Sequence, residues 1–268
     1  MKYEPIKDKL SSIIGDSTFL RRALYALLGI IFLREWHVKR GLRKTMRELK
    51  PRTILDAGSG FGQYSYYVAK NSDAEVLGVD INGDEVEKCN KFAGAMRIAR
   101  LSFQQGDLEK LEIDRKFDLV ISVDVMEHIK NDLQVFTNFF RLLSAGGKVL
   151  ISTPSNFGGS NVHEEGEHSF IDEHYRDGYT ESDITSKLES AGFKIESIRY
   201  TYGKIGSWYW NLAVRIPVRL LNRSFGFMLV LPFYYILVFP FALVFMTFDY
   251  YFPPEKGSGL LVIARKGG

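Results

Sequence analysis

The chain has 268 residues, of which 46% are hydrophobic and 25% charged, a composition that excludes a disordered polar chain and supplies one full α/β core with insertions. The single cysteine, Cys89, excludes an internal disulfide, and the sequence opens with no basic, apolar, small-residue leader. The expected location is therefore the cytoplasm.

Positive charge is concentrated at the start of the chain. The formal net charge is only +3, but residues 1–52 hold thirteen Lys and Arg against five Asp and Glu. These cations are either the solvated face of helices or a segment attracted to an anionic phospholipid surface. Nucleic acid is not an expected partner, because the charge neighbours an apolar run and not interleaved base-stacking aromatics. We treat residues 1–50 as a basic N-terminal helical cap.

Within this cap, residues 19–36 (FLRRALYALLGIIFLREW) place eleven uncharged residues after a basic pair. A helix that spans a bilayer needs ~20 apolar residues. The stretch is too short for that and predicts a core or interfacial helix.

The middle of the chain alternates strand-like and helix-like segments. Short apolar, β-branched runs end in Gly, Asp or Pro, and segments of helical length separate them. This alternation predicts an α/β fold, a doubly wound parallel sheet with helices on both faces. The expected strands are residues 53–58, 75–80, 101–107, 117–125, 147–154, 193–200 and 259–266, which assigns the core to residues 51–200 and 259–268.

A glycine-rich turn follows the first expected strand in the stretch ILDAGSGFGQYS, residues 54–65. Glycine permits positive φ and lets a ligand approach main-chain N–H groups at a helix N-terminus. A dinucleotide fingerprint would need its third glycine at position 63, which is Gln63; the third glycine is Gly62. An acid, Asp56, also precedes the loop.

Carboxylates end the following strands as well. Asp80 closes the second strand, where it can accept hydrogen bonds from both hydroxyls of a ribose. Asp107, after the third strand, can accept from an exocyclic adenine amine, and the fourth strand brings Ser122 and Asp124 to the same edge. The ordered set predicts a site for a ligand that carries adenine and ribose.

Together these motifs closely resemble the class I S-adenosylmethionine-dependent methyltransferases, in particular the ubiquinone and menaquinone biosynthesis branch. The resemblance implies a seven-stranded Rossmann-like sheet whose last strand is antiparallel and lies between the fifth and sixth. It implies S-adenosyl-L-methionine as cofactor. By this resemblance the amino-acid end of the cofactor is held by Asp56, Gly58, Ser59 and Gly60, the ribose and adenine by Asp80 and Ile81, the base by Asp107 and Leu108, and the sulfonium is flanked by Val123 and Asp124.

Methyl transfer needs a base only when the nucleophile must lose a proton. His128, His163 and His168 are the candidate bases; the last two lie in the stretch after the fifth strand, where this family usually builds part of its substrate lid. The grouping of Asp124, Glu127 and His128 also allows a divalent metal, as in related quinone O-methyltransferases. We favour a site without metal, because the first position is Asp and the Glu-His pair is common in relatives that bind none.

An apolar helical insertion is expected between the sixth and seventh strands, at residues 201–258. Its first part (208–223) begins with aromatics and carries Arg215, Arg219 and Arg223 at four-residue spacing, as in an interfacial helix. Its second part (226–248) has no charged residue, but the chain must return to the sheet, which argues against a single crossing. A re-entrant or in-plane membrane helix is favoured over a helix buried in a dimer interface or in the core.

The leading hypothesis is a methyltransferase bound peripherally or monotopically to the inner face of the membrane. Its acceptor would be lipid-soluble, such as a quinone precursor, a polyprenyl-linked compound or a phospholipid, and methylated by direct in-line transfer. One alternative is a soluble O- or N-methyltransferase for small molecules, whose insertion is a lid or the arm of a homodimer. Another is a non-catalytic cofactor-binding regulator at the membrane.

Overall fold

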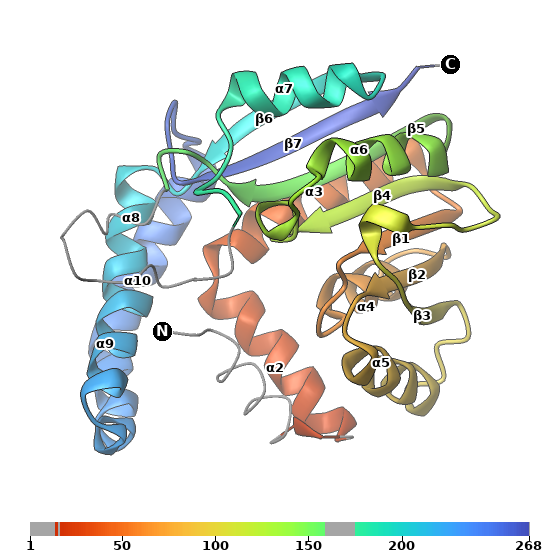
Figure 1. The fold of residues 1–268 in the computed structure, drawn as a ribbon. Coiled ribbons are helices and arrows are strands. Elements are labelled where there is room, and N and C mark those ends of the chain that lie inside the picture. Colours follow the sequence, from red (N-terminus) through yellow and green to blue (C-terminus); the bar gives the residue numbers. More distant parts are fainter. Residues whose placement is uncertain (1–13, 16, 159–174, 268) are drawn as a thin grey trace.

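One mixed sheet organises the protein. The computed structural model describes residues 14–15, 17–158 and 175–267. The strands follow the order β3-β2-β1-β4-β5-β7-β6, and β7 is antiparallel to both of its neighbours (Figure 1). The strands are β1 (Thr53–Ala57), β2 (Glu75–Asp80), β3 (Leu101–Gln105), β4 (Phe117–Val123), β5 (Leu143–Pro154), β6 (Phe193–Thr201) and β7 (Gly259–Lys266). The predicted sheet is confirmed, including the position of its last strand.

Helices cover both faces of the sheet. One face carries α6 (Asp132–Leu142) and α7 (Glu181–Ser190), and the short turns η1 (Leu108–Lys110) and η2 (Met126–His128) lie at the ends of β3 and β4. The other face carries α3 (Leu33–Leu49), α4 (Gln63–Lys70) and α5 (Gly83–Ala95). The central strands are buried on both sides, as their near-continuous apolar runs require.

The N-terminal region contains two helices, α2 (Thr18–Ile31) and α3, separated at Phe32. Helix α3 packs Val38 and Leu42 onto the sheet against Leu150 and Leu261, so it forms a layer of the central fold. Helix α2 leaves that layer and crosses toward α4 and α5 (Figure 1).

The insertion between β6 and β7 is a helical hairpin, which we define as residues 204–251. It descends through α8 (Lys204–Trp210), the π-helical turn η3 (Asn211–Arg215) and α9 (Ile216–Arg223), turns at η4 (Phe225–Leu229) and returns as α10 (Leu231–Tyr251). The two arms lie side by side and project from the sheet (Figure 1). The predicted helical insertion and its return to the sheet are confirmed.

Two tyrosines join the arms where the first arm loses its own hydrogen bonds. The π turn directs the Ile216 N–H to the Asn211 carbonyl, and Pro217 has no N–H to donate. The carbonyl of Leu212 therefore loses both of its helical donors, and that of Ala213 loses its α-helical donor. They accept instead from the hydroxyls of Tyr234 and Tyr235 on α10, each at 2.7 Å.

Helix α10 is long and apolar but exposed. Its 21 residues are long and apolar enough to cross a membrane, and only 11% of its apolar window is buried, which separates it from the core helix of a soluble protein. Its buried side chains are Ala242, Met246 and Asp249. Its exposed apolar positions include Phe233, Ile236, Leu237, Phe241, Val244 and Phe248. This surface has no partner within the described residues.

A buried carboxylate fixes the hairpin to the sheet. Asp249, at the end of α10, accepts the N–H groups of Tyr202 (3.1 Å) and Gly203 (2.7 Å), where β6 gives way to the hairpin. The same carboxylate lies 2.9 Å from Nε2 of His37 on α3. A side chain at position 206 would collide with it, since a Cβ there would lie 2.5 Å from Asp249 Oδ2. Asp249 thus joins the hairpin, β6 and α3.

We predict that Asp249→Ala destabilises the protein by roughly 2–5 kcal/mol, because it leaves two N–H groups and the His37 ring buried without their acceptor. Asp249→Asn keeps one acceptor oxygen and is expected to lose less. Urea unfolding measures both variants against Thr247→Ala, an exposed change two residues away that should stay within about 0.5 kcal/mol of wild type. Equal stability of Asp249→Ala and Thr247→Ala would contradict this role.

Candidate active site

The glycine-rich turn lies at the carboxyl edge of β1, as predicted. The N–H groups of Gly58 and Ser59 donate to the Val79 carbonyl of β2 at 2.8 and 2.9 Å. Gly58 has φ +79°, and a Cβ there would lie 2.2 Å from a methyl of Val125. Gly60 has φ +48° and open space where its Cβ would be. The first glycine allows close packing, and the second leaves room for a ligand against the backbone.

Asp80 holds this turn from the end of β2. One carboxylate oxygen accepts the Gly60 N–H at 2.7 Å, and the other accepts the Asn82 N–H at 2.9 Å. Each oxygen keeps a further lone pair that can accept from a hydroxyl. Ile81 is 72% exposed beside it and offers an apolar surface to a flat base.

Asp107 and Leu108 lie at the next strand end. Asp107 accepts the Glu109 N–H at 2.9 Å and so caps η1, while Leu108 is buried in the core. The structure therefore gives Asp107 a local structural contact and leaves its second oxygen for a ligand.

Several buried polar atoms at this edge have no hydrogen-bond partner within the described residues. They are Ser59 Oγ, Gln63 Oε1 and Ser122 Oγ. Each such atom costs about 1–3 kcal/mol when it stays unsatisfied. A polar ligand bound here would satisfy them. The chain thus fits a cofactor with amine, carboxylate and ribose groups.

Asp124 is held in an unusual conformation directly after β4. Its φ is +52°, in the left-handed region, and it forms an ion pair with Arg34 of α3. This backbone strain costs ~1–3 kcal/mol, whereas a partly exposed ion pair contributes about 0–1 kcal/mol. The side chains of Arg34 and Asp124 are 35% and 27% exposed, so a ligand can reach them. Stability does not explain the arrangement, which points to function. Val123 is buried beside it.

Glu127 and His128 follow Asp124 in η2. Glu127 is buried and accepts from the Thr153 hydroxyl at 3.1 Å, and burial raises the pKa of its carboxyl despite the nearby His128 and Arg34. His128 is half-buried at the same edge. No group of three or more His, Cys, Asp or Glu suited to a metal occurs among the residues that the structure describes. The other candidate bases, His163 and His168, lie outside those residues.

The sequence did not predict the residues of α2 that hold the glycine-rich turn. On α2, Arg21 donates to the Phe61 carbonyl at 3.1 Å, and the Tyr25 hydroxyl donates to the same carbonyl. Arg21 also donates to the Cys89 sulfur at 3.2 Å. Arg21 is 2% exposed, so it is not one of the solvated cations that the basic cap predicts. The only sequence signal for the burial of Arg21 is the apolar run that follows it.

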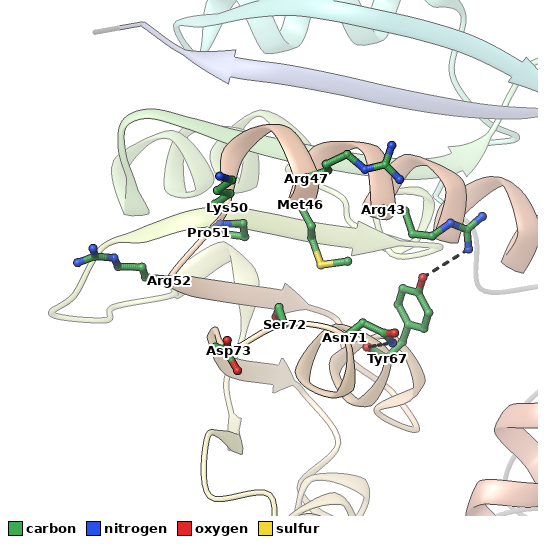
Figure 2. A pocket seen from close by; sticks show the side chains of 10 residues that line it. All are labelled: Arg43, Met46, Arg47, Lys50, Pro51, Arg52, Tyr67, Asn71, Ser72 and Asp73. Atoms are coloured by element: carbon green, nitrogen blue, oxygen red, sulfur yellow. Dashed lines mark hydrogen bonds between the residues drawn. The ribbon is translucent and has the colours of Figure 1, made fainter.

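A separate cavity of about 510 Å³ opens near the end of α3 and the start of β1 (Figure 2). Figure 2 shows Arg43 reaching the Tyr67 hydroxyl across it, and cations outnumber the single carboxylate in its lining. It is lined by Arg43, Met46, Arg47, Lys50, Pro51, Arg52, Tyr67, Asn71, Ser72 and Asp73. Because these residues lie at the amino ends of the strands, the cavity does not belong to the site described above.

Comparison with known proteins identifies the family. The profile of a family described as a methyltransferase domain matches residues 49–196. Phosphoethanolamine N-methyltransferase 3 of Arabidopsis thaliana is 34% identical over 150 residues, which is 52% of this chain and 30% of that protein. Tocopherol O-methyltransferase of the same plant is 31% identical over 115 residues, 42% of this chain and 33% of that protein. The chain spans about a third of the length of these relatives.

Solved structures share the fold. A methyltransferase from Clostridium acetobutylicum superimposes with a TM-score of 0.60 at 14% identity, over 97% of this chain and 99% of that one. Phosphoethanolamine N-methyltransferase 2 of Haemonchus contortus, solved with S-adenosyl-L-methionine, gives 0.58 at 18% identity, over 81% of this chain and 49% of that one. The predicted fold and the resemblance to a methyltransferase domain are confirmed, whereas the quinone-biosynthesis branch is not among these findings.

The buried Asp56 makes the stability of the cofactor-free protein depend on pH. Burial raises the pKa of Asp56 from 3.8 to about 6, although the Ser65 hydroxyl, at 2.5 Å, acts against this rise. The folded-state pKa of Asp56 exceeds the unfolded one. The contribution of Asp56 to the free energy of unfolding is therefore fully present below pH ~4 and is lost as the pH rises through 6, a loss of about 2–3 kcal/mol.

We predict that Asp56→Asn removes most of this loss, which urea unfolding between pH ~4.5 and ~7.5 measures. Ser65→Ala removes a hydrogen bond to the ionised form and should move the fall to higher pH. An Asp56→Asn protein that keeps the wild-type slope would show that another group causes the pH dependence.

Proposed function

Because the chain belongs to the methyltransferase domain family, we propose that it transfers a methyl group from S-adenosyl-L-methionine to a lipid-soluble acceptor at a membrane. One observation carries the lipid part of this proposal. The hairpin, whose returning helix α10 is exposed and carries no charged residue before the buried Asp249, leaves and rejoins the sheet at the edge that holds the glycine turn and Asp124.

The cofactor brings a methyl group on a sulfonium, already a strong electrophile, so the protein mainly has to position the acceptor and exclude water. Asp56, Ser59 and Gly60 would hold the amino-acid end of the cofactor. Asp80 and Ile81 would hold its ribose and adenine, with Asp107 and Leu108 against the base and Val123 and Asp124 beside the sulfonium. The proposal is supported by Asp56, Asp80, Asp107 and Asp124, which lie at or directly after the carboxyl ends of β1 to β4.

Proton transfer is needed only for an acceptor that must be deprotonated. His128 is then the base we propose, since it lies one residue from the buried Glu127 and close to Asp124. Arg34, paired with Asp124 at the mouth, would orient the acceptor. Metal takes no part in this proposal.

The hairpin suits an in-plane position in one leaflet. Ala213 and Pro217 of the first arm are buried, while Arg215 and Arg219, two residues further along, project from the opposite side of the helix at 100° per residue. The arginine face would meet headgroups while α10 enters the acyl layer. Trp208 and Trp210, both exposed near the sheet, suit the membrane interface. This supports monotopic binding at the cytoplasmic face.

The relatives support an acceptor with a lipid connection. Their names include enzymes that methylate phosphoethanolamine and tocopherol, at nitrogen and oxygen respectively. A phospholipid, a polyprenyl-linked compound and a quinone precursor all fit a site whose mouth opens beside a leaflet, and the last would place the chain in the quinone-biosynthesis branch.

Flotation with vesicles of phosphatidylcholine and phosphatidylglycerol tests the membrane part. We predict that the full chain floats and that Phe233→Glu/Leu237→Glu loses at least about tenfold in binding, because each charge placed in hydrocarbon costs roughly 2–3 kcal/mol. Both positions are about 70% exposed in the fold. The control is Leu133→Glu on α6, exposed at 42% but outside the hairpin.

Binding of S-adenosylhomocysteine should be unchanged in all of these variants, since neither region touches the glycine turn. A wild-type chain that stays at the bottom of the gradient and is fully soluble without detergent would refute membrane binding. A dimer that Phe233→Glu/Leu237→Glu splits would instead assign the hairpin to the arm of a soluble enzyme.

A further inference from the structure

Helix α2 has two faces of different character. Arg21, Leu24 and Tyr25 are buried on the inner face. The outer face is exposed and mainly apolar, with the exposed Arg22 at its margin; its apolar side chains are Phe19, Leu20, Ala23, Ala26, Leu27 and Ile30. We call these six residues the α2 stripe.

The inner face of α2 holds the glycine turn of the cofactor site. Both Arg21 and Tyr25 donate to the carbonyl of Phe61, which lies between Gly60 and Gly62. The Tyr25 ring also packs against Tyr66 of α4 and Phe92 of α5, with centroids 5.5 and 5.7 Å away. Any force that keeps α2 in place therefore also keeps the turn in its present shape.

The C-terminal end of α2 contacts the hairpin. The carbonyl of Ile31, the last residue of α2, accepts from the Tyr209 hydroxyl of α8. Both α2 and the hairpin extend from the sheet in the same direction (Figure 1). A flat leaflet that receives α10 would thus also meet the α2 stripe.

Charges around the stripe favour a lipid occupant. The segment from Ala23 to Leu33 contains no charge, and exposed Arg22 precedes it. An apolar stripe with an exposed arginine at its border matches the acyl layer and the anionic headgroups of one leaflet.

We propose that the α2 stripe is a second lipid contact, through which membrane binding clamps α2 onto the glycine turn and strengthens cofactor binding. This inference rests on the membrane location proposed above. The coupling is reciprocal, because whatever factor the membrane adds to cofactor affinity, the cofactor must add to membrane affinity. The enzyme would then hold its cofactor best where its acceptor is.

Calorimetric titration with S-adenosylhomocysteine, with and without phosphatidylcholine–phosphatidylglycerol vesicles, tests the coupling. For the wild-type chain we expect the vesicles to lower Kd by about fivefold or more. Leu27→Gln/Ile30→Gln should keep the Kd measured without vesicles and lose the gain. Leu133→Gln, an exposed change on α6, should keep the gain. Hydrogen exchange of residues 18–31 should slow on vesicles in the wild-type chain and in Leu133→Gln, but not in Leu27→Gln/Ile30→Gln.

The outcomes separate this inference from the proposed function. A wild-type chain that floats but shows the same Kd with and without vesicles overturns the coupling and leaves the membrane location standing. A gain that persists in Leu27→Gln/Ile30→Gln overturns the role of the stripe. A dimer that this double variant splits assigns the stripe to a second copy of the chain, and a chain that does not float overturns both proposals.

Discussion

The antiparallel position of β7 between β5 and β6 is the constraint on which the rest of the structure depends. Because β6 ends and β7 begins at the carboxyl edge of the sheet, everything inserted between them must leave and return beside the cofactor site. Asp249 fixes the hairpin in this position, because its carboxylate accepts hydrogen bonds from the backbone just before the hairpin and contacts His37 of α3. An apolar helix elsewhere on the fold could act only as an anchor. The hairpin lies beside the carboxyl edge of the sheet, next to the cofactor site.

Local pattern was sufficient to predict the strands, whereas the antiparallel place of the last strand followed from the family resemblance. Each strand is an apolar run bounded by a turn residue, so its existence was predictable, while its ends depended on neighbours. The third strand ends at Gln105 because Asp107 caps η1, and the fourth ends at Val123 because Asp124 turns into the left-handed region. The fifth strand begins at Leu143, earlier than predicted, since pairing with Phe117 recruits residues before the glycine pair.

The site was predictable where it consists of residues close to strand ends and not where it depends on contacts between distant segments. Asp56 and Asp80 lie where the motifs place them, because each belongs to its own strand, and Gly60 follows three residues after the end of β1. The contact of Arg21 with Phe61 joins residues 40 apart, and that of His37 with Asp249 joins residues 212 apart. No period or motif encodes such pairs. They arise from packing, which a single sequence does not display.

Mass spectrometry of lipid extracts tests the central claim most directly. Cells that produce the wild-type chain are compared with cells that lack it and with cells that produce Asp80→Ala, in which the glycine turn loses its acceptor. The account predicts a pair of lipids that differ by one methylene unit, with the heavier member present only with the wild-type chain. Identical lipid extracts, together with a new methylated compound in the aqueous phase, would contradict it.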